Sequence, residues 1–555
     1  MKKIFITCAA ILALLPSCAS VLDKEDMNSI SEDKVWADPT LATAFVNGLY
    51  VSIPGWDVSL ADATDEATGG GSWCYGTVTP DSPIWYWPYS NIRNTNTFIQ
   101  NIQDPSVCSI ENEQLKSRLL AEARFIRAYL YFEMVKRYGG VPLLTKPQEL
   151  TDDLMVRRNS TKECFDFIIT ELEACSQVLP DSYDAADEGR VTKGAAQSFL
   201  GRVLLFRASK QFNPNNNPQL WQQAYDYNKK TLDYLLAQGY ALQEDYEKLF
   251  LDEMNKEVVF AIRYINPGRT HNRDAAVRPI KFSQNASGGC HPTQETLDHF
   301  PTVDGKRFTI EDIQEGQDIR DLWKNRDKRF YATIVYQESI YFNEEMELQE
   351  NAENDYAYGK NVGSKTGYYS KKAIDQSLSI TDAQASGTDY IDIRLAEVML
   401  NYAEAAVEVG KNDEAFDMLK QIRKRAGIHE TSTDPELKGK LYGLDPNMNQ
   451  TEMREAVREE RFVEFLFEQK RLWDMRRWMI YDQIMNGQGK RHALVLNKQA
   501  NGDYTWYLFD RDNTPMITNQ NIYFLPMKRG EMSNNPNLEQ TKGWENGTFD
   551  PQAGL

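Results

Sequence analysis

Histidine is scarce in this 555-residue chain: there are five, and none of them lies at the spacing of a zinc site. No G-x-S-x-G motif, which marks the nucleophile of an α/β-hydrolase, is present either. The 81 acidic residues could still place two carboxylates together, as glycosidases require, but the sequence cannot select such a pair. We therefore expect no catalytic residues, no metal site and no cofactor.

Cysteine is also rare, and the seven residues are Cys8, Cys18, Cys74, Cys108, Cys164, Cys175 and Cys290. Cys164 and Cys175 share a predicted helix, where eleven residues separate them by about three turns, too far for a disulfide. Once Cys8 and Cys18 are set aside for the reason given below, five remain, and an odd number cannot all pair. We expect no disulfide framework and no cysteine metal cluster.

Positive charge is in deficit, with 62 Lys and Arg against 81 Asp and Glu and a net charge of −19. Such a surface repels phosphates and anionic lipid, so we expect no nucleic acid partner. The acidic excess is compatible with simple solubility and also with an uncharged ligand.

Long apolar runs are missing except at the start of the chain, where Lys2 and Lys3 precede the largely apolar stretch 4–15. This order is typical of a secretory signal peptide, and the stretch is too short to span a bilayer. Leu15-Pro16-Ser17-Cys18 resembles the lipobox of bacterial lipoproteins. We predict cleavage after residue 17 and lipid attached to Cys18, which would anchor the chain to a membrane. The alternative is an ordinary signal peptide with an incidental cysteine.

Helical patterns occupy much of the remaining chain. Asp38-Pro39 is typical of a helix start, Ser160 and Glu163 form a capping box, and Gly139-Gly140 follows a long apolar stripe at 119–134. Further helices are predicted at 196–206, 390–426 and 451–482. The hairpin around Gly410 resembles a degenerate tetratricopeptide repeat, although a generic helical hairpin would have the same pattern.

Between about 241 and 390 the pattern changes to short β-rich runs, such as 257–262 and 331–336, set among Gly, Asn and Asp. The tail around 522–526 is predicted as loop and strand. Within 451–482, Arg461–Glu464, Glu468–Arg471 and Arg471–Asp474 stand three residues apart on a predicted helix. We interpret them as a structural ion-pair network, with a partner surface as the alternative.

Aromatic side chains concentrate between residues 56 and 93, in a segment whose triple glycine and prolines predict loop structure. Loop aromatics on a helical scaffold commonly form binding surfaces. We predict ligand contacts from Trp73 and Tyr75, which follow the triple glycine, and from Asp65, Trp85 and Trp87. The loop 266–291 could add Asn285. The alternative is that these side chains pack in the core, against a partner or, for Asn285, in an ordinary surface loop.

Several short segments occur in a fixed order along the chain: 121–129 (AEARFIRAY), 138–143 (YGGVPL), 190–196 (RVTKGAA), 394–405 (RLAEVMLNYAEA), 422–427 (IRKRAG), 460–465 (ERFVEF), 476–478 (RRW) and 535–538 (NPNL). Together they resemble the SusD/RagB family of outer-membrane nutrient-binding lipoproteins of Bacteroidetes. One departure is Gln469, which stands where a glycine is common in the family. The acidic run 23–26 resembles surface-export signals of such lipoproteins, which favours the outer face of the outer membrane.

The resemblance implies a mostly α fold, an α–α superhelix of four tetratricopeptide-like helix pairs packed against an irregular region with short strands. We expect one domain over 18–555. Its helical framework would lie mainly at 38–240 and 390–482, and its irregular ligand-side region mainly at 53–110, 241–389 and 483–555.

The resemblance also implies a role. Family members cover a SusC-like TonB-dependent transporter, bind an oligosaccharide or peptide, deliver it for uptake, and are not enzymes. We expect an oligosaccharide ligand. The alternatives are a peptide ligand, a surface glycoside hydrolase, or a structural lid with no ligand of its own.

Overall fold

The computed structural model describes residues 32–82, 85–284, 289–512 and 514–555. The long helices are α4 (Pro39–Tyr50), α7 (Tyr89–Gln103), α8 (Glu113–Tyr138), α9 (Thr161–Val178), α10 (Lys193–Ala208), α11 (Pro218–Ala237), α15 (Leu395–Glu408), α16 (Asn412–Arg425) and α17 (Gln450–Phe465). The short helices are α3 (Glu32–Val35), α5 (Ser59–Asp62), α6 (Gly71–Cys74), α12 (Arg273–Val277), α13 (Gln294–Asp298), α14 (Lys328–Thr333), α18 (Arg471–Arg477), α19 (Tyr481–Met485) and α20 (Arg529–Asn534). None of the helices in these ranges has the length and apolar character needed to cross a membrane.

The strands are short and form two-stranded antiparallel sheets. They are β1 (Val258–Ile262) with β6 (Tyr390–Arg394), β2 (Ile334–Val335) with β5 (Tyr369–Ser370), β3 (Ile340–Tyr341) with β4 (Glu344–Glu345), and β7 (His492–Lys498) with β8 (Tyr504–Asp510).

The predicted helix ends are confirmed where a capping side chain was visible in the sequence. Asp38 accepts a hydrogen bond from the Thr40 amide at 2.7 Å and starts α4. Ser160 and Glu163 form the capping box of α9. Gly139 ends α8 with a φ of 73°. This left-handed conformation is unfavourable for a residue that has a Cβ atom. Cys164 and Cys175 are buried on α9 and, like the other cysteines in the described part of the chain, are free.

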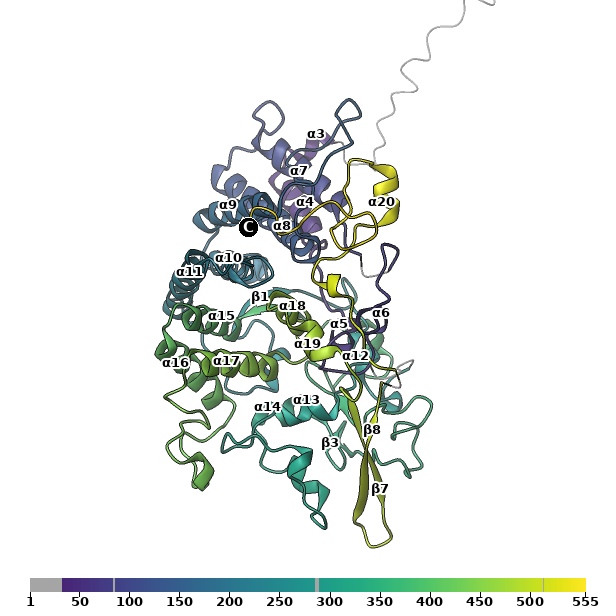
Figure 1. Cartoon of the computed structure of the whole chain (residues 1–555). Coiled ribbons are helices and arrows are strands. Elements are labelled where there is room, and N and C mark those ends of the chain that lie inside the picture. Colours follow the sequence, from purple (N-terminus) through teal and green to yellow (C-terminus); the bar gives the residue numbers. More distant parts are fainter. Residues whose placement is uncertain (1–31, 83–84, 285–288, 513) are drawn as a thin grey trace, which may run out of the picture.

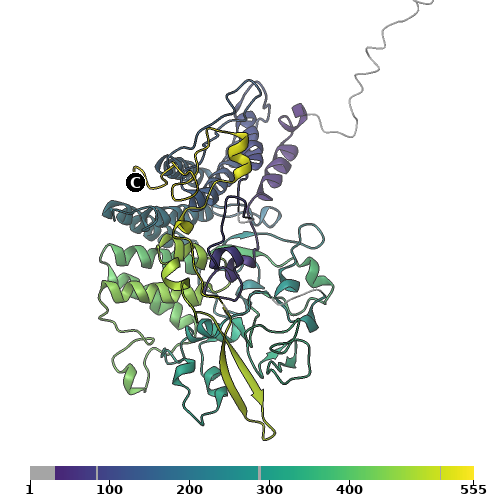
Figure 2. The ribbon, with the colours of Figure 1, turned by 45° about the vertical axis from the view of Figure 1, so that its right-hand side comes forward.

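The long helices pack in chain order into a curved layer (Figure 1). The pairs α10–α11 and α15–α16 are joined by short links, α8 and α9 pair across the longer link 139–160, and α4 with α7 forms a fourth pair that lies on α8. This confirms the mostly helical, tetratricopeptide-like fold. Most of the short helices and the strands lie to one side of the layer, whereas α3 packs on α4 (Figure 1). The β7–β8 hairpin projects from the region of short elements (Figure 2). The helix α7 belongs to the helical layer, although its residues fall within the 53–110 segment expected to be irregular.

Three predictions of secondary structure are wrong in part. The strand expected at 331–336 begins as α14, because Asp327 caps the amides of Arg329 and Phe330, and only Ile334–Val335 forms a strand. The helix expected from residue 390 begins at Leu395, since Tyr390–Arg394 pairs with β1. The tail forms no strand at 522–526, since residues 520–523 are a short 3-10 helix, and the helix α20 follows.

The predicted helix at 451–482 is three helices, because α17 ends at Phe465. Phe467 and Gln469 in the link to α18 have φ values of 62° and 63°. This left-handed backbone favours glycine and is strained for a residue that has a Cβ atom. Gln469 tolerates it while its amide side chain binds the Asp57 N–H at 2.9 Å and the Gly55 carbonyl at 3.3 Å.

The ion-pair network exists, but its partners differ from those predicted within one helix. Glu464 and Glu468 both bind the buried Arg394 of β6, at 2.6 and 2.8 Å. Arg461 pairs with Asp474 at 2.9 Å across the helix break. Removing one partner from such a buried pair typically costs about 3–5 kcal/mol, so these contacts fix how α17 and α18 join the sheet of β1 and β6.

Candidate functional site

A compact loop between α5 and α6 carries the triple glycine. Gly69, Gly70 and Gly71 have φ values of 128°, 87° and 40°, and a Cβ on Gly70 would lie 2.3 Å from the Asp62 carbonyl oxygen and from the Cys74 Sγ atom. The glycines therefore permit a tight fold-back of the chain. The triple glycine is explained by the positive φ values and the close backbone approach of this loop, and not by mobility.

Arg491, at the base of the β7–β8 hairpin, holds this loop in place. Its guanidinium group donates to the carbonyl oxygens of Asp62, Ala67 and Gly69 at 3.3, 3.0 and 3.0 Å. It also pairs with Asp512 at 2.6 Å. Because Arg491 is buried and its donors are used, we assign it a positioning role.

Tyr75 joins the loop to Asp512, the carboxylate that also pairs with Arg491. Its hydroxyl donates to the Asp512 carboxylate at 2.9 Å, and the ring is half-buried. Burial and the Asp512 carboxylate both raise the pKa of Tyr75, so its hydroxyl stays protonated at neutral pH. Tyr75 therefore lies beside the Asp512 carboxylate, which Tyr75 and Arg491 together hold in one orientation.

The strand β8, which ends two residues before Asp512, carries exposed aromatic rings. Tyr507 and Phe509 are 45% and 39% exposed and lie opposite Val495 and Ala493, so all four side chains share one face of the hairpin. Tyr358 packs beneath this face. The Arg511 guanidinium lies 5.7 Å from the centre of the Phe509 ring. We call Tyr75, Asp512, Arg511, Phe509 and Tyr507 the candidate site.

These five residues combine exposed flat rings with charged and hydroxyl groups. Exposed rings can stack on the apolar C–H face of a ring-shaped ligand, and Arg511 and the Tyr75 hydroxyl can bind its hydroxyls. Asp512 is 1% exposed and serves to orient Tyr75. The sequence analysis found only Tyr75. The signal for the others was the aromatic run 504–509, but the exposed side chains could not be identified before the strand register was known.

Acidic groups below the glycine loop have shifted pKa values. Burial raises the pKa of Asp62 to about 6, although the Lys365 and Arg491 charges oppose the shift. Burial raises the pKa of Glu66 to about 8, and its carboxyl accepts a hydrogen bond from the Phe467 amide at 3.0 Å. The loop is thus supported by a carboxyl group that is largely neutral at pH 7.

Trp73 and Asp65, which the sequence analysis assigned to the ligand, lie inside the protein. Trp73 is 8% exposed and packs against the guanidinium group of Arg476 at 5.7 Å. Asp65 pairs with Arg471 at 2.6 Å. Burial acts to raise the pKa of Asp65, but the charge and hydrogen bonds of Arg471 outweigh it and lower this pKa. Trp73 is thus buried, whereas Asp65 is part-buried with its carboxylate paired, and their contact with a ligand stays a prediction.

Trp85 and Trp87 form a separate aromatic pair. Their rings stack 5.8 Å apart, Trp87 meets Tyr138 edge-on, and the Lys528 ammonium group lies 4.3 Å from the Trp85 ring. Among the residues that the structure describes, no ring contact or hydrogen bond joins this pair to Tyr75. The predicted residues Cys18 and Asn285 lie outside the described residues.

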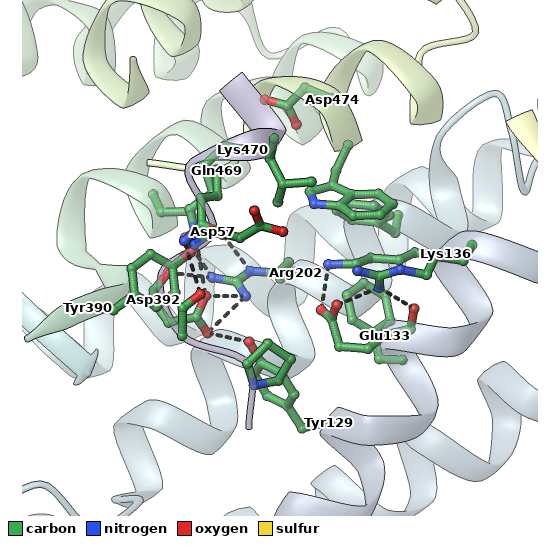
Figure 3. A pocket seen from close by; sticks show the side chains of 18 of the residues that line it. Asp57, Tyr129, Glu133, Lys136, Arg202, Tyr390, Asp392, Gln469, Lys470 and Asp474 are labelled. Carbon is green, nitrogen blue, oxygen red and sulfur yellow. Dashed lines mark hydrogen bonds and ion pairs between the residues drawn. The ribbon is translucent and has the colours of Figure 1, made fainter. Parts of the chain in front are cut away.

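A polar cavity of about 90 Å³ lies deeper, between α8, α10, α15, α18 and the segment 54–60 (Figure 3). Its charged side chains pair with one another: Arg202 binds Glu397 at 2.6 Å and Asp392 at 3.1 Å, and Lys136 binds Glu133. Burial lowers the pKa of Lys136 to about 7, against the opposing charge of Glu133. A polar cavity of this size has room for several ordered waters. We interpret it as a hydrated part of the interior.

Within the described ranges, no group of three or more His, Cys, Asp or Glu side chains is placed to hold a metal ion.

Comparison with known families identifies the chain. Residues 256–544 match the model described as the SusD family, and residues 72–205 match the model described as "Starch-binding associating with outer membrane". The chain belongs to the SusD family.

SusD-like proteins of two organisms are similar over most of this family member. A SusD-like protein of Bacteroides ovatus is 24% identical over 83% of this chain and 80% of its own. SusD-like protein P2 of Formosa agariphila is 22% identical over 97% of this chain and 100% of its own.

Solved structures of SusD-like proteins share the fold. A SusD-like protein of Bacteroides fragilis has a TM-score of 0.75 and 28% identity, covering 94% of this chain and 100% of its own. A SusD-like carbohydrate-binding protein of the same species has a TM-score of 0.73 and 24% identity, covering 91% of this chain and 100% of its own.

Proposed function

We propose that this SusD-family protein binds an oligosaccharide at the cell surface and delivers it to a SusC-like TonB-dependent outer-membrane transporter. The observation that carries the proposal is the exposed aromatic face of Tyr507 and Phe509 with Arg511, on the strand that leads to Asp512, the partner of Tyr75, in a chain of this family. The description of the matching family model as starch-binding, and the similar carbohydrate-binding protein of B. fragilis, support a glycan ligand.

The chemistry of the candidate site suits a sugar. A pyranose has apolar C–H faces that stack on Tyr507 and Phe509, and hydroxyls at its edge that Arg511 and the hydroxyl of Tyr75 can bind. Its placement on a hairpin and a buttressed loop, and not in a deep pocket, suits an extended chain of sugars. We expect binding without turnover, so the proposal assigns no catalytic residue.

Anchoring is the second part of the proposal. Lipid on Cys18 would hold the protein at the outer membrane, facing the exterior, beside its transporter. Support comes from the lipobox-like sequence and from the matching model described as associating with the outer membrane.

The test of the site is isothermal titration against a panel of oligosaccharides, using the wild type and a Tyr507→Ala, Phe509→Ala double variant. Losing two stacked rings should weaken binding by about tenfold or more. Leu508→Ala is the matched control, because Leu508 is 38% exposed on the same strand but points to the opposite face. Equal affinities of the double variant and the wild type would refute the site.

The same titrations separate the alternatives. If affinity survives in the double variant but falls in a Trp85→Ala, Trp87→Ala variant, the binding surface is the stacked tryptophan pair. Tight binding of peptides without any glycan would establish the peptide ligand instead. Release of reducing ends from any glycan would show a hydrolase, and absence of any ligand would leave a structural lid.

A further inference from the structure

The turn between α8 and α9 exposes apolar side chains in an acidic setting. Leu150 is 96% exposed, and Leu154 and Met155 are 42% and 43% exposed. Glu149 and Asp153 are exposed beside them, and neither forms an ion pair among the described residues. We call residues 149–155 the acidic turn.

The acidic turn is held in one conformation by its own hydrogen bonds. The Glu149 amide donates to the Asp152 carboxylate, and the Asp152 amide donates to the Glu149 carbonyl, each at 3.0 Å. Asn537 from the tail donates to the Met155 carbonyl at 2.6 Å. Leu150 is therefore presented at the tip of an ordered turn, which lowers the entropic cost of inserting it into a partner.

A groove of about 550 Å³ lies over α15 between α11 and α16. Its lining is largely apolar and includes Leu232, Leu236, Leu395, Met399 and Met418, of which Leu236 is 51% exposed. A volume of this size is in the range of binding sites, and methionine adapts to different apolar partners.

Two lysines mark the edge of this groove. Lys328 and Lys424 line it, are exposed, and form no ion pair with any described residue. The groove also contains Glu244 and Arg425, and Arg425 already pairs with Glu257 and Glu464. The two lysines are therefore available cations on a chain whose net charge is −19.

We propose that the acidic turn of one copy docks into the groove of a second copy. Leu150 would enter the apolar groove, and Glu149 and Asp153 would meet Lys328 and Lys424. Two copies of so acidic a chain repel each other at long range, so association requires a local match of this kind. The acidic turn and the groove supply both halves of it.

The contact would be head to tail. The acidic turn joins α8 and α9, whereas the groove is formed by α11, α15 and α16 further along the helical layer (Figure 1). After pairing, one copy keeps a free groove and the other keeps a free turn, so further copies can add on as an open chain. On a membrane this would align neighbouring receptors in rows.

Sedimentation velocity of the purified protein tests the proposal. The runs use low salt and protein concentrations from about 5 to about 300 µM, a range that reveals a weak contact of small area. We expect the wild type to associate, and Leu150→Asp and the Lys328→Glu, Lys424→Glu double variant each to remain monomeric. A mixture of the two variants should form one-to-one dimers, since one retains its groove and the other its turn. Ile340→Asp and Lys438→Glu, two exposed changes elsewhere, should associate like the wild type.

A charge exchange gives a second measurement that does not depend on apolar burial. The Glu149→Lys, Asp153→Lys variant should pair with the Lys328→Glu, Lys424→Glu variant at least about tenfold more tightly than it pairs with the wild-type groove. A wild type that stays monomeric throughout, a Leu150→Asp variant that associates normally, or a variant mixture that stays monomeric would each overturn the proposal. A monomeric wild type would leave the groove to a different protein.

Discussion

At the scale of single residues, Gln469 and Glu66 attach the segment 54–67 to the link between α17 and α18. Gln469 binds the Asp57 amide and the Gly55 carbonyl, and Glu66 accepts from the Phe467 amide. Both residues are in an unfavourable state: the backbone of Gln469 has a positive φ, and the carboxyl group of Glu66 is buried. Their contacts compensate for these settings, and each can be tested by a small substitution.

Substitutions of Gln469 should give an unusual order of unfolding free energies. Gln469→Ala removes two hydrogen bonds, worth about 1 kcal/mol each, and keeps the strained backbone. Gln469→Gly removes the same bonds but relieves about 1 kcal/mol of strain. Urea unfolding should therefore rank the wild type first, glycine second and alanine last. An alanine variant as stable as the glycine variant would contradict the role assigned to the positive φ.

Glu66 predicts a pH-dependent stability. Its pKa is about 8 in the folded protein and 4.5 in the reference state, so the folded state holds the proton more tightly. The resulting stabilisation is complete below pH 4.5 and is lost as the pH rises through 8. Glu66→Gln keeps the acceptor for Phe467 and cannot ionise.

Relative to the wild type, Glu66→Gln should gain stability as the pH rises from about 5 to about 8, by at most about 1.4 kcal/mol per pH unit. Urea unfolding at several pH values measures this difference. The exposed Glu111→Gln is the control and should follow the wild type at every pH. A constant difference between Glu66→Gln and the wild type would show that Glu66 is already ionised.

At the scale of elements, helices with local caps were predictable and segments with distant partners were not. The side chains of Asp38 and Ser160 start their helices within three residues of themselves. The strand β6 instead forms because it pairs with β1, more than 120 residues away. Local spacing therefore predicted the helical layer, whereas the strand at 390–394 and the break after Phe465 depended on contacts that no short window contains.

A substitution of Gly70 tests whether the loop beside the candidate site requires glycine for its stability. Gly70→Ala places a Cβ 2.3 Å from the Asp62 carbonyl at a φ of 87°. Gly239→Ala is the matched control, because its φ is 89° and nothing lies within 4 Å of its Cβ. We expect a cost of about 1 kcal/mol for the control and at least about 2 kcal/mol more for Gly70→Ala, measured by urea unfolding. Equal costs would show that the loop adapts freely.

At the scale of the whole molecule, the proposed anchor and the candidate site act independently. Cys18 precedes the described residues, and the candidate site lies on β8, on the two residues after it and on Tyr75 at the end of α6. Cys18→Ala should therefore leave the dissociation constant for the glycan unchanged and reduce uptake by cells strongly. Titration of the purified variant and growth on the glycan measure the two effects. Normal uptake by the unlipidated variant would refute the tethering role.

The sequence by itself determined the family and the helical framework, because ordered motifs and helix caps are local patterns, and it predicts a signal peptide with lipid on Cys18. Tertiary structure decided which aromatics are exposed. Trp73 and Tyr75 stand two residues apart, yet Trp73 packs on Arg476 while Tyr75 reaches Asp512. Tyr507 and Phe509 became candidates only once the register of β7 and β8 placed them on one open face. Burial depends on contacts between distant segments, and composition does not record it.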